Sequence, residues 1–169
     1  MPGFELFWNV LTADLRVTFF LFLLFAVPIG IRLAKEIIDL RMIRRSGMAD
    51  IDVMSGVMFD VYLRELFSSQ GYKVQQTPAR GDYGADLILS DGKKHIAVQA
   101  KRYKKNVGVK AVQEVSSAKA YYKADEAWVV TNADYTANAK NLAASNQIRL
   151  IGRVELMKMM IAMNEKQAQ

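Results

Sequence analysis

Cysteine is absent from this chain of 169 residues, and histidine occurs once. The absence of cysteine excludes disulfide bonds and thiolate metal sites, and it is consistent with a reducing compartment. Acidic residues are the minority charge, since 23 lysines and arginines oppose 17 aspartates and glutamates to give a formal net charge of +6. This balance favours an anionic partner, nucleic acid or anionic lipid, and charge alone does not choose between them.

Long stretches without charge are also missing, with one exception at positions 17–31, VTFFLFLLFAVPIGI, which is bounded by Arg16 and Arg32. The alternatives to a membrane-spanning helix are a signal peptide and a buried core helix. A signal peptide requires a basic start and a small-residue cleavage site, and neither is present. A core helix requires polar positions on one side, and this run has almost none. We therefore expect a transmembrane helix within residues 1–34.

The positive residues fall mainly after this run, at Arg32, Lys35, Arg41, Arg44 and Arg45. Because lysine and arginine accumulate on the cytoplasmic side, we expect a single-pass protein of the cell membrane with its N-terminus outside. The lipid bilayer is then one predicted partner. Residues 35–52 are expected to form a basic stalk or linker, residues 53–163 a folded domain and residues 164–169 a disordered tail. Hydrophobic residues make up 51% of the chain, which is enough for a sizeable core.

A β-hairpin is indicated between Arg80 and Lys101. Its two apolar-rich runs, Ala85–Ser90 and Lys94–Lys101, are separated by Asp91-Gly92, a dipeptide that tolerates positive φ and closes tight hairpins.

Three polar side chains converge if this hairpin forms. Gln99 and Lys101 project from one face of the second run, and Asp86 lies within a few residues of being opposite them. Oxygen ligands from carboxylates and amides suit Mg²⁺. A nearby lysine orients or deprotonates water and stabilises charge on a phosphate. The pattern therefore indicates metal-assisted chemistry on phosphate esters.

The same residues resemble a known family. Asp86 followed by Gln99-Ala100-Lys101 is similar to the D…QxK form of the PD-(D/E)XK signature in Mrr-like (type IV) restriction endonucleases. The resemblance runs from about Met54 to Met160 and includes Phe59-Asp60, the run Asp82, Gly84 and Asp86, and Thr131-Asn132. Most of the wider superfamily has Glu or Asp at the position of Gln99, whereas the Mrr-like branch has Gln. The helix acid, usually Glu, is here Asp60.

This resemblance implies a Mg²⁺- or Mn²⁺-dependent endonuclease that hydrolyses DNA. Asp86 and Gln99 would bind the metal with help from Asp60, and Lys101 would act on the attacking water. The implied fold is α/β, a restriction-endonuclease-like αβββαβ core with a mixed sheet flanked by helices, preceded by one transmembrane helix. The predicted order of elements, helix, three strands, helix, strand, helix, strand, agrees with it.

A basic segment follows the hairpin and is expected to contact DNA phosphates. Its cations are Arg102, Lys104, Lys105 and Lys110, and a solvated charged loop is the alternative. The resemblance adds Gln113 as a residue that lines the cleft.

Three other residues near these motifs have competing interpretations. A helical wheel hardly separates Asp60 from Glu65, and only the resemblance favours Asp60. Asp82 is expected to be a turn residue, with a metal contact through water as the alternative. His95 is expected to take a structural or rim position, with a catalytic one as the alternative.

The hypothesis is a membrane-anchored nuclease. The alternative is a catalytically inactive module of nuclease fold that binds nucleic acid or a protein partner at the membrane. The oligomeric state is open, with a homodimer as one option.

Overall fold

The computed structural model describes residues 15–45, 47–78 and 83–167, with side chains described at 18–34, 47–78 and 83–166. The chain divides into two compact units, Met1–Met42 and Ile43–Gln169.

Helix α2 (Leu15–Arg45) begins in the first unit, continues through Pro28 and ends just beyond the boundary of that unit at Met42. Within the part of the chain whose side chains are described, no helix combines the length and the apolar character needed to cross a membrane. The expectation of a transmembrane helix is therefore not supported. The physical reason is length, because about fifteen uncharged residues between two arginines span roughly 22 Å, against a hydrocarbon core of about 30 Å.

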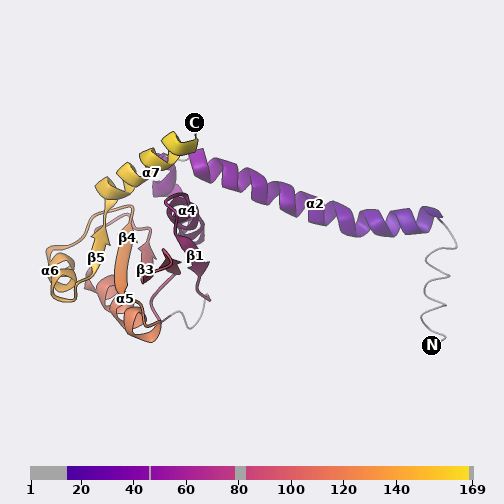
Figure 1. The fold of residues 1–169 in the computed structure, drawn as a ribbon. Helices are drawn as coiled ribbons and strands as arrows, with labels where there is room; N and C mark the ends of the chain where they lie inside the picture. The colour runs from indigo at the N-terminus through magenta and orange to yellow at the C-terminus, as the bar shows by residue number, and fades with distance from the viewer. Residues whose placement is uncertain (1–14, 46, 79–82, 168–169) are drawn as a thin grey trace, which may run out of the picture. The chain divides into compact units, whose positions relative to one another are not determined.

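The second unit is an α/β domain (Figure 1). Its elements are α3 (Met48–Val53), α4 (Gly56–Ser69), β1 (Lys73–Gln76), β2 (Leu87–Ser90), β3 (His95–Lys101), α5 (Val109–Tyr121), β4 (Glu126–Thr131), α6 (Ala137–Ser145), β5 (Arg149–Ile151) and α7 (Arg153–Gln167). The strands lie in the order β1-β2-β3-β4-β5. The first two pairings are antiparallel and the last two parallel, which confirms the predicted mixed sheet.

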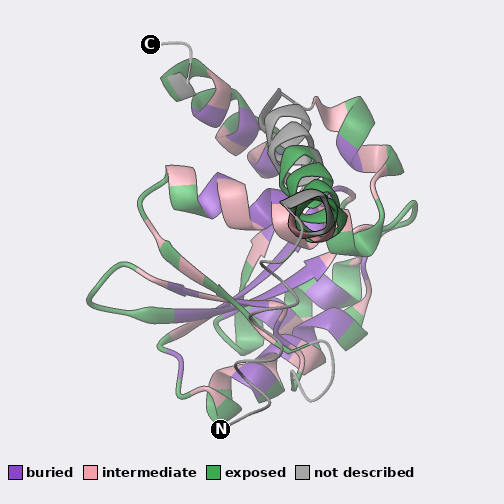
Figure 2. Ribbon diagram, turned by 90° about the vertical axis from the view of Figure 1, so that its right-hand side faces the viewer, coloured by how far each residue is buried: buried purple, intermediate pink, exposed green. Residues whose placement is uncertain are grey.

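Helices cover both faces of this sheet, and each face has its own core. On one face α4 and α7 pack over Leu87, Val98 and Trp128. On the other, α5 and α6 pack over Ala97 and Val129. Neighbouring strand residues enter different cores because successive side chains point to opposite faces. Figure 2 shows the buried central strands between the two helical layers.

Local sequence signals account for several element ends. The Ser55 hydroxyl accepts a hydrogen bond from the Met58 N–H (3.2 Å) and so caps α4. In the hairpin turn, an Asp91 carboxylate oxygen accepts the N–H groups of Lys93 (2.8 Å) and Lys94 (2.9 Å). Gly92 adopts a φ of 89° in the same turn, which its missing side chain permits. The predicted hairpin is therefore confirmed.

Two helices extend beyond the limits predicted for the folded domain. Helix α3 belongs to the folded unit because Ile51 is fully buried in the core under α4, so the domain begins before residue 53. The linker predicted at 35–52 is correspondingly shorter. At the other end, residues 164–167 continue α7 instead of forming a disordered tail, since Met160 and Met163 anchor the helix in the same core. Residues 168–169 lie outside the described part of the chain.

Candidate active site

The hairpin brings the three predicted polar residues together. Leu87 pairs with Val98, and the Asp86 N–H donates to the Val98 carbonyl (2.8 Å), so Asp86 lies beside Gln99 just before β2 begins. One Asp86 carboxylate oxygen accepts hydrogen bonds from the Gln99 amide and from the Ala100 N–H (2.7 Å). Gln99 is buried, with an exposed fraction of 3%. The Gln99 side chain and the Ala100 backbone of β3 therefore hold the Asp86 carboxylate in a fixed orientation.

Asp60 approaches this group from α4. Burial is the main cause that raises its pKa to about 7, the negative charge of Asp86 raises the pKa further, and Lys101 acts in the opposite direction. Two carboxylates therefore repel each other across a half-buried space. Glu65, which the helical wheel left as an alternative, instead lies 3.7 Å from Arg64.

Lys101, at the end of β3, forms an ion pair with Glu114 of α5 (2.9 Å). Burial acts to lower the pKa of Lys101, but the hydrogen bond and charge of Glu114, together with Asp86, outweigh it and raise the pKa. The ammonium group is therefore protonated at neutral pH. The sequence analysis assigned no role to Glu114. The one sequence feature that could have drawn attention to it is its position four residues after Lys110, with which it forms a second ion pair (3.9 Å).

Gly84 allows α5 to approach the start of β2. Its φ is 92°, and a Cβ placed there would lie 2.4 Å from the Glu114 carbonyl oxygen and 2.9 Å from the Glu114 Cα. No side chain fits at such distances from a backbone. Glycine therefore permits the contact that sets Asp86, two residues later, beside the helix that carries Glu114.

The donor set suits a divalent cation. Asp60 and Asp86 supply carboxylate oxygens. The Gln99 side chain now points its amide nitrogen at Asp86, and it supplies an oxygen when the amide group flips. Burial, followed by the negative charge of Asp86, raises the pKa of Asp60, and a cation bound between the two carboxylates would act against both causes. Among the described residues, no group of three or more His, Cys, Asp or Glu is placed to hold a metal. The candidate ligands are thus two acids and one amide, and Asp82 lies outside the described residues.

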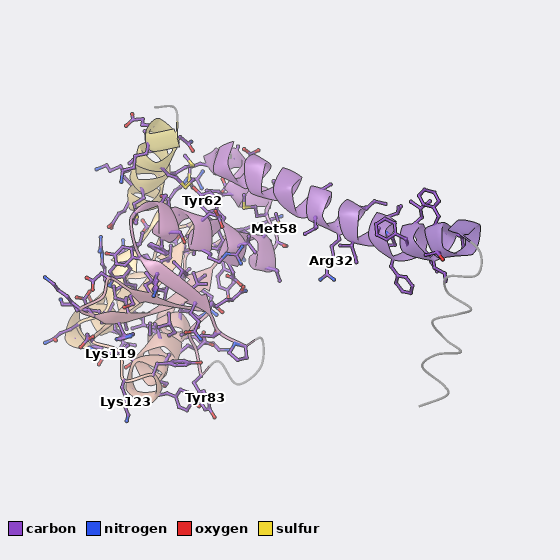
Figure 3. All side chains as sticks on the ribbon, turned by 45° about the vertical axis from the view of Figure 1, so that its right-hand side comes forward. Arg32, Met58, Tyr62, Tyr83, Lys119 and Lys123 are labelled. Atoms are coloured by element: carbon purple, nitrogen blue, oxygen red, sulfur yellow. The ribbon has the colours of Figure 1, made fainter. Side chains whose placement is uncertain are left out.

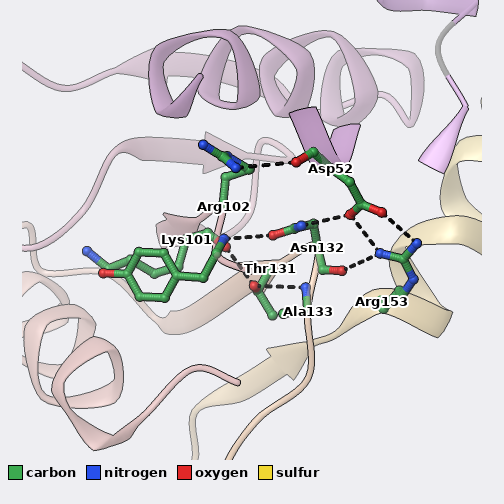
Figure 4. Close-up of polar contacts among 8 residues, drawn as sticks. Asp52, Lys101, Arg102, Thr131, Asn132, Ala133 and Arg153 are labelled. Atoms are coloured by element: carbon green, nitrogen blue, oxygen red, sulfur yellow. Dashed lines mark hydrogen bonds and ion pairs between the residues drawn. The ribbon is translucent and has the colours of Figure 1, made fainter. Parts of the chain in front are cut away.

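A polar network braces the strand end that carries Lys101 (Figure 4). The Thr131 hydroxyl donates to the Lys101 carbonyl (2.6 Å), and the Asn132 amide oxygen accepts the Tyr103 N–H (2.8 Å). Asn132 in turn donates to Asp52 (2.8 Å). Thr131 and Asn132, which form part of the family resemblance, therefore fix the backbone on both sides of Arg102.

Asp52 and Arg153 complete this network and were not found by sequence reasoning. Two Arg153 nitrogens donate to the two Asp52 carboxylate oxygens at 2.7 and 2.8 Å. The hydrogen bond from Arg153 is the first cause that lowers the pKa of Asp52. The partners are 101 residues apart in the chain, so no local pattern links them.

The predicted DNA-contacting residues occupy different environments. Arg102 is partly buried and donates to the Asp52 carbonyl (3.3 Å), so it belongs to the same polar network as Asp52, Asn132 and Arg153. Lys104 and Lys105 are exposed in the loop that follows, and Gln113 is exposed on α5. Lys110 is exposed and lies 3.9 Å from Glu114. His95 is exposed at the start of β3, where its backbone N–H donates to an Asp125 carboxylate oxygen (2.8 Å). This bond does not involve the imidazole, so the role expected for the His95 side chain stays a prediction.

A cavity of about 790 Å³ lies beside this polar network, at the carboxyl ends of β3, β4 and β5. It is lined by Asp52, Tyr103, Lys104, Asn106, Asn132, Ala133, Asp134, Gly152, Arg153, Val154 and Glu155. Lys101, Asp86 and Gln99 are not among these residues, so the cavity adjoins the candidate site without containing it.

Comparison with known proteins identifies a similar fold and the family of this chain. The solved structure of a protein of unknown function, AF1548, has a similar fold, with a TM-score of 0.53 and 14% sequence identity over 65% of this chain and 65% of that one. No curated protein matches the chain. The restriction endonuclease family Mrr_cat matches residues 51–160, a range that contains Asp60, Asp86, Gln99 and Lys101. Because the match covers more than half of the sequence, the chain belongs to the Mrr_cat family of restriction endonucleases.

Proposed function

We propose that this protein is a metal-dependent endonuclease that hydrolyses phosphodiester bonds in DNA. The observation that supports it most directly is the convergence of Asp86, Gln99 and Lys101 at the edge of β3, with Asp60 facing them from α4. Membership of a restriction endonuclease family supports DNA as the substrate.

Each site residue has a distinct role in this proposal. Asp86, Gln99 and Asp60 would hold Mg²⁺ or Mn²⁺, and the bound cation would polarise the phosphate and make bound water a better nucleophile at neutral pH. Lys101 is protonated, so it acts as a cation that orients water and stabilises charge developing on the phosphate. Glu114 holds the Lys101 ammonium in position. Exposed Lys104 and Lys105 contact DNA phosphates, with Lys110 and Gln113 on α5 as further contacts.

The test is cleavage of plasmid DNA by the full-length chain in mild detergent. We expect nicking with Mg²⁺ or Mn²⁺ and none with a chelator. Asp86→Asn should reduce the rate by about 10³-fold or more, because it removes a metal-binding charge. Asp91→Asn is the matched control, because Asp91 lies in the exposed hairpin turn.

A different outcome would favour the alternative function. If the wild-type chain binds DNA in a salt-sensitive manner but cuts no substrate with either metal, the protein is a binding module of nuclease fold. Gln99 is the residue on which this alternative depends, because an amide oxygen is a weaker metal ligand than the carboxylate that most of the wider superfamily has there, although the Mrr-like branch also has Gln. The homodimer stays a prediction.

We also propose that α2 attaches the protein to the cell membrane, with the nuclease domain on the cytoplasmic side. Four phenylalanines of α2 are more than 60% exposed, at Phe19, Phe20, Phe22 and Phe25. Exposed apolar surface of this extent usually marks a protein or membrane contact. The basic residues that follow Arg32 favour the cytoplasmic side. Since no described helix suffices to cross the bilayer, the proposal is limited to attachment.

Cell fractionation checks this location. The full-length chain should sediment with membranes, resist extraction by salt and be released by detergent, whereas Phe22→Lys with Phe25→Lys should release it to the supernatant. Protease added to intact cells should leave the nuclease domain uncut. A chain found in the supernatant without substitution would contradict attachment.

A further inference from the structure

Two tyrosines form an exposed aromatic pair near the candidate active site. The rings of Tyr83 and Tyr121 are stacked, with centroids 3.7 Å apart and planes at 21°. Their exposed fractions are 53% and 55%, and neither belongs to the two cores. Tyr83 adopts a φ of 50°, a conformation that bulky residues rarely adopt and that is concentrated at functional sites. The pair is therefore kept at the surface at a conformational cost.

The pair is tied to the site through Gly84 and α5. Gly84, next to Tyr83, packs against the backbone of Glu114, which binds Lys101. Tyr121 follows Glu114 by seven residues on the same helix, which is two turns and about 10.5 Å along its axis. Seven residues also return to nearly the same face. At about 3.4 Å per nucleotide along one strand, this distance equals about three nucleotide steps.

An exposed, mostly polar stripe on α5 runs from the candidate active site to the tyrosine pair. Lys110, Gln113, Ser117 and Tyr121 are all exposed, and their spacing of three or four residues puts them on one face of α5. Lys119, in the last turn of α5, and Lys123, just beyond it, add positive charge near the tyrosines. Figure 3 shows Tyr83 and Lys123 toward the same end of the domain.

We propose that the Tyr83–Tyr121 pair is a stacking platform for an unpaired base of the DNA substrate, about three nucleotides from the bond that is cut. This rests on the proposed nuclease function and names its substrate class, DNA with locally unpaired nucleotides such as a gap or a flap. The reason is steric, because bases within an intact duplex already stack on both faces and leave none for a tyrosine ring. Aromatic side chains beside cations bind unpaired bases in this way with little sequence preference.

The experiment measures binding of the full-length chain, in chelator, to two fluorescent DNAs of equal length. One is an intact duplex, and the other has a short gap with 2-aminopurine in the unpaired strand. We expect the wild type to bind the gapped DNA about 10-fold more tightly and to quench 2-aminopurine by stacking. Tyr83→Ala with Tyr121→Ala should lose the preference and the quenching while still binding duplex. The matched control, Tyr83→Phe with Tyr121→Phe, keeps both rings and should keep both signals.

The outcomes separate this proposal from the nuclease proposal. Wild-type chain that binds neither DNA would overturn both. Wild-type chain that binds both DNAs equally without quenching, or alanine variants that keep the quenching, would overturn the platform alone. Loss of quenching in the phenylalanine variant would also overturn it, because the hydroxyl groups would then be responsible. If the double alanine variant fails to fold, Tyr83→Ala alone gives the same test, since Tyr83 lies outside both cores.

Discussion

Lys101→Ala is expected to reduce the rate of DNA cleavage at saturating DNA by about 10²–10³-fold or more, while weakening DNA binding little. The ammonium group lies at the end of β3 beside Asp86 and stays protonated through its ion pair with Glu114. In the proposed mechanism its charge stabilises the negative charge that develops on the phosphate, and removing one such group typically costs this much. Single-turnover cleavage and binding in chelator, measured on the same variant, separate the two effects.

The neighbouring lysines are the control for this expectation. Lys104→Ala with Lys105→Ala should weaken binding and reduce its salt dependence by about one unit of slope for each phosphate that is no longer neutralised, with little effect on the saturated rate. Glu114→Gln should lower the rate less than Lys101→Ala, because it frees the ammonium without removing it. If Lys101→Ala cuts as fast as the wild type once DNA is saturating, Lys101 contributes to binding alone.

Gly84→Ala is expected to lower the free energy of unfolding by about 2–4 kcal/mol and to reduce cleavage strongly. Alanine at a positive φ costs about 1 kcal/mol by itself. The new Cβ would also lie 2.4 Å from the Glu114 carbonyl oxygen, and this oxygen belongs to the backbone of α5 and cannot rotate away. Relieving the clash moves the start of β2 away from α5, and it carries Asp86 with it. Urea denaturation of the full-length chain measures the loss of stability.

Gly92→Ala is the matched control for this substitution. Gly92 also has a positive φ, 89°, but nothing lies within 4 Å of a Cβ placed there. We therefore expect it to lose only about 1 kcal/mol and to retain cleavage. Equal losses of stability in both variants would show that backbone strain is the whole effect and that contact between Gly84 and α5 has no further role.

The sequence alone determined the elements from α4 to α7 and the local arrangement of Asp86, Gln99 and Lys101. Alternation along β3 placed Gln99 and Lys101 on one face, and the turn at Asp91-Gly92 fixed the register that sets Asp86 beside Gln99. These contacts lie within one hairpin, so short-range rules of strand and turn geometry are enough to predict them. On α4, Phe59, Leu63, Leu66 and Phe67 recur at helical spacing in the sequence, and all four are fully buried.

The long-range contacts were decided only by the tertiary structure. The choice of Asp60 over Glu65 depends on how α4 packs over the sheet, since both residues sit at the margins of the same apolar stripe. The pairing of Lys101 with Glu114 depends on how α5 crosses β3. Asp52 and Arg153 meet only because α3 and the start of α7 lie at the same edge of the domain.

The physical reason is the range over which each force specifies partners. Hydrogen-bond geometry and side-chain periodicity act over a few residues, so the sequence displays them directly. Packing of apolar faces decides which helices meet, but it is non-directional. No short-range sequence pattern therefore shows which polar residues it will bring together. For this protein, the sequence thus determined the hairpin with Asp86, Gln99 and Lys101, whereas packing of α3, α4, α5 and α7 decided which acids and cations surround it.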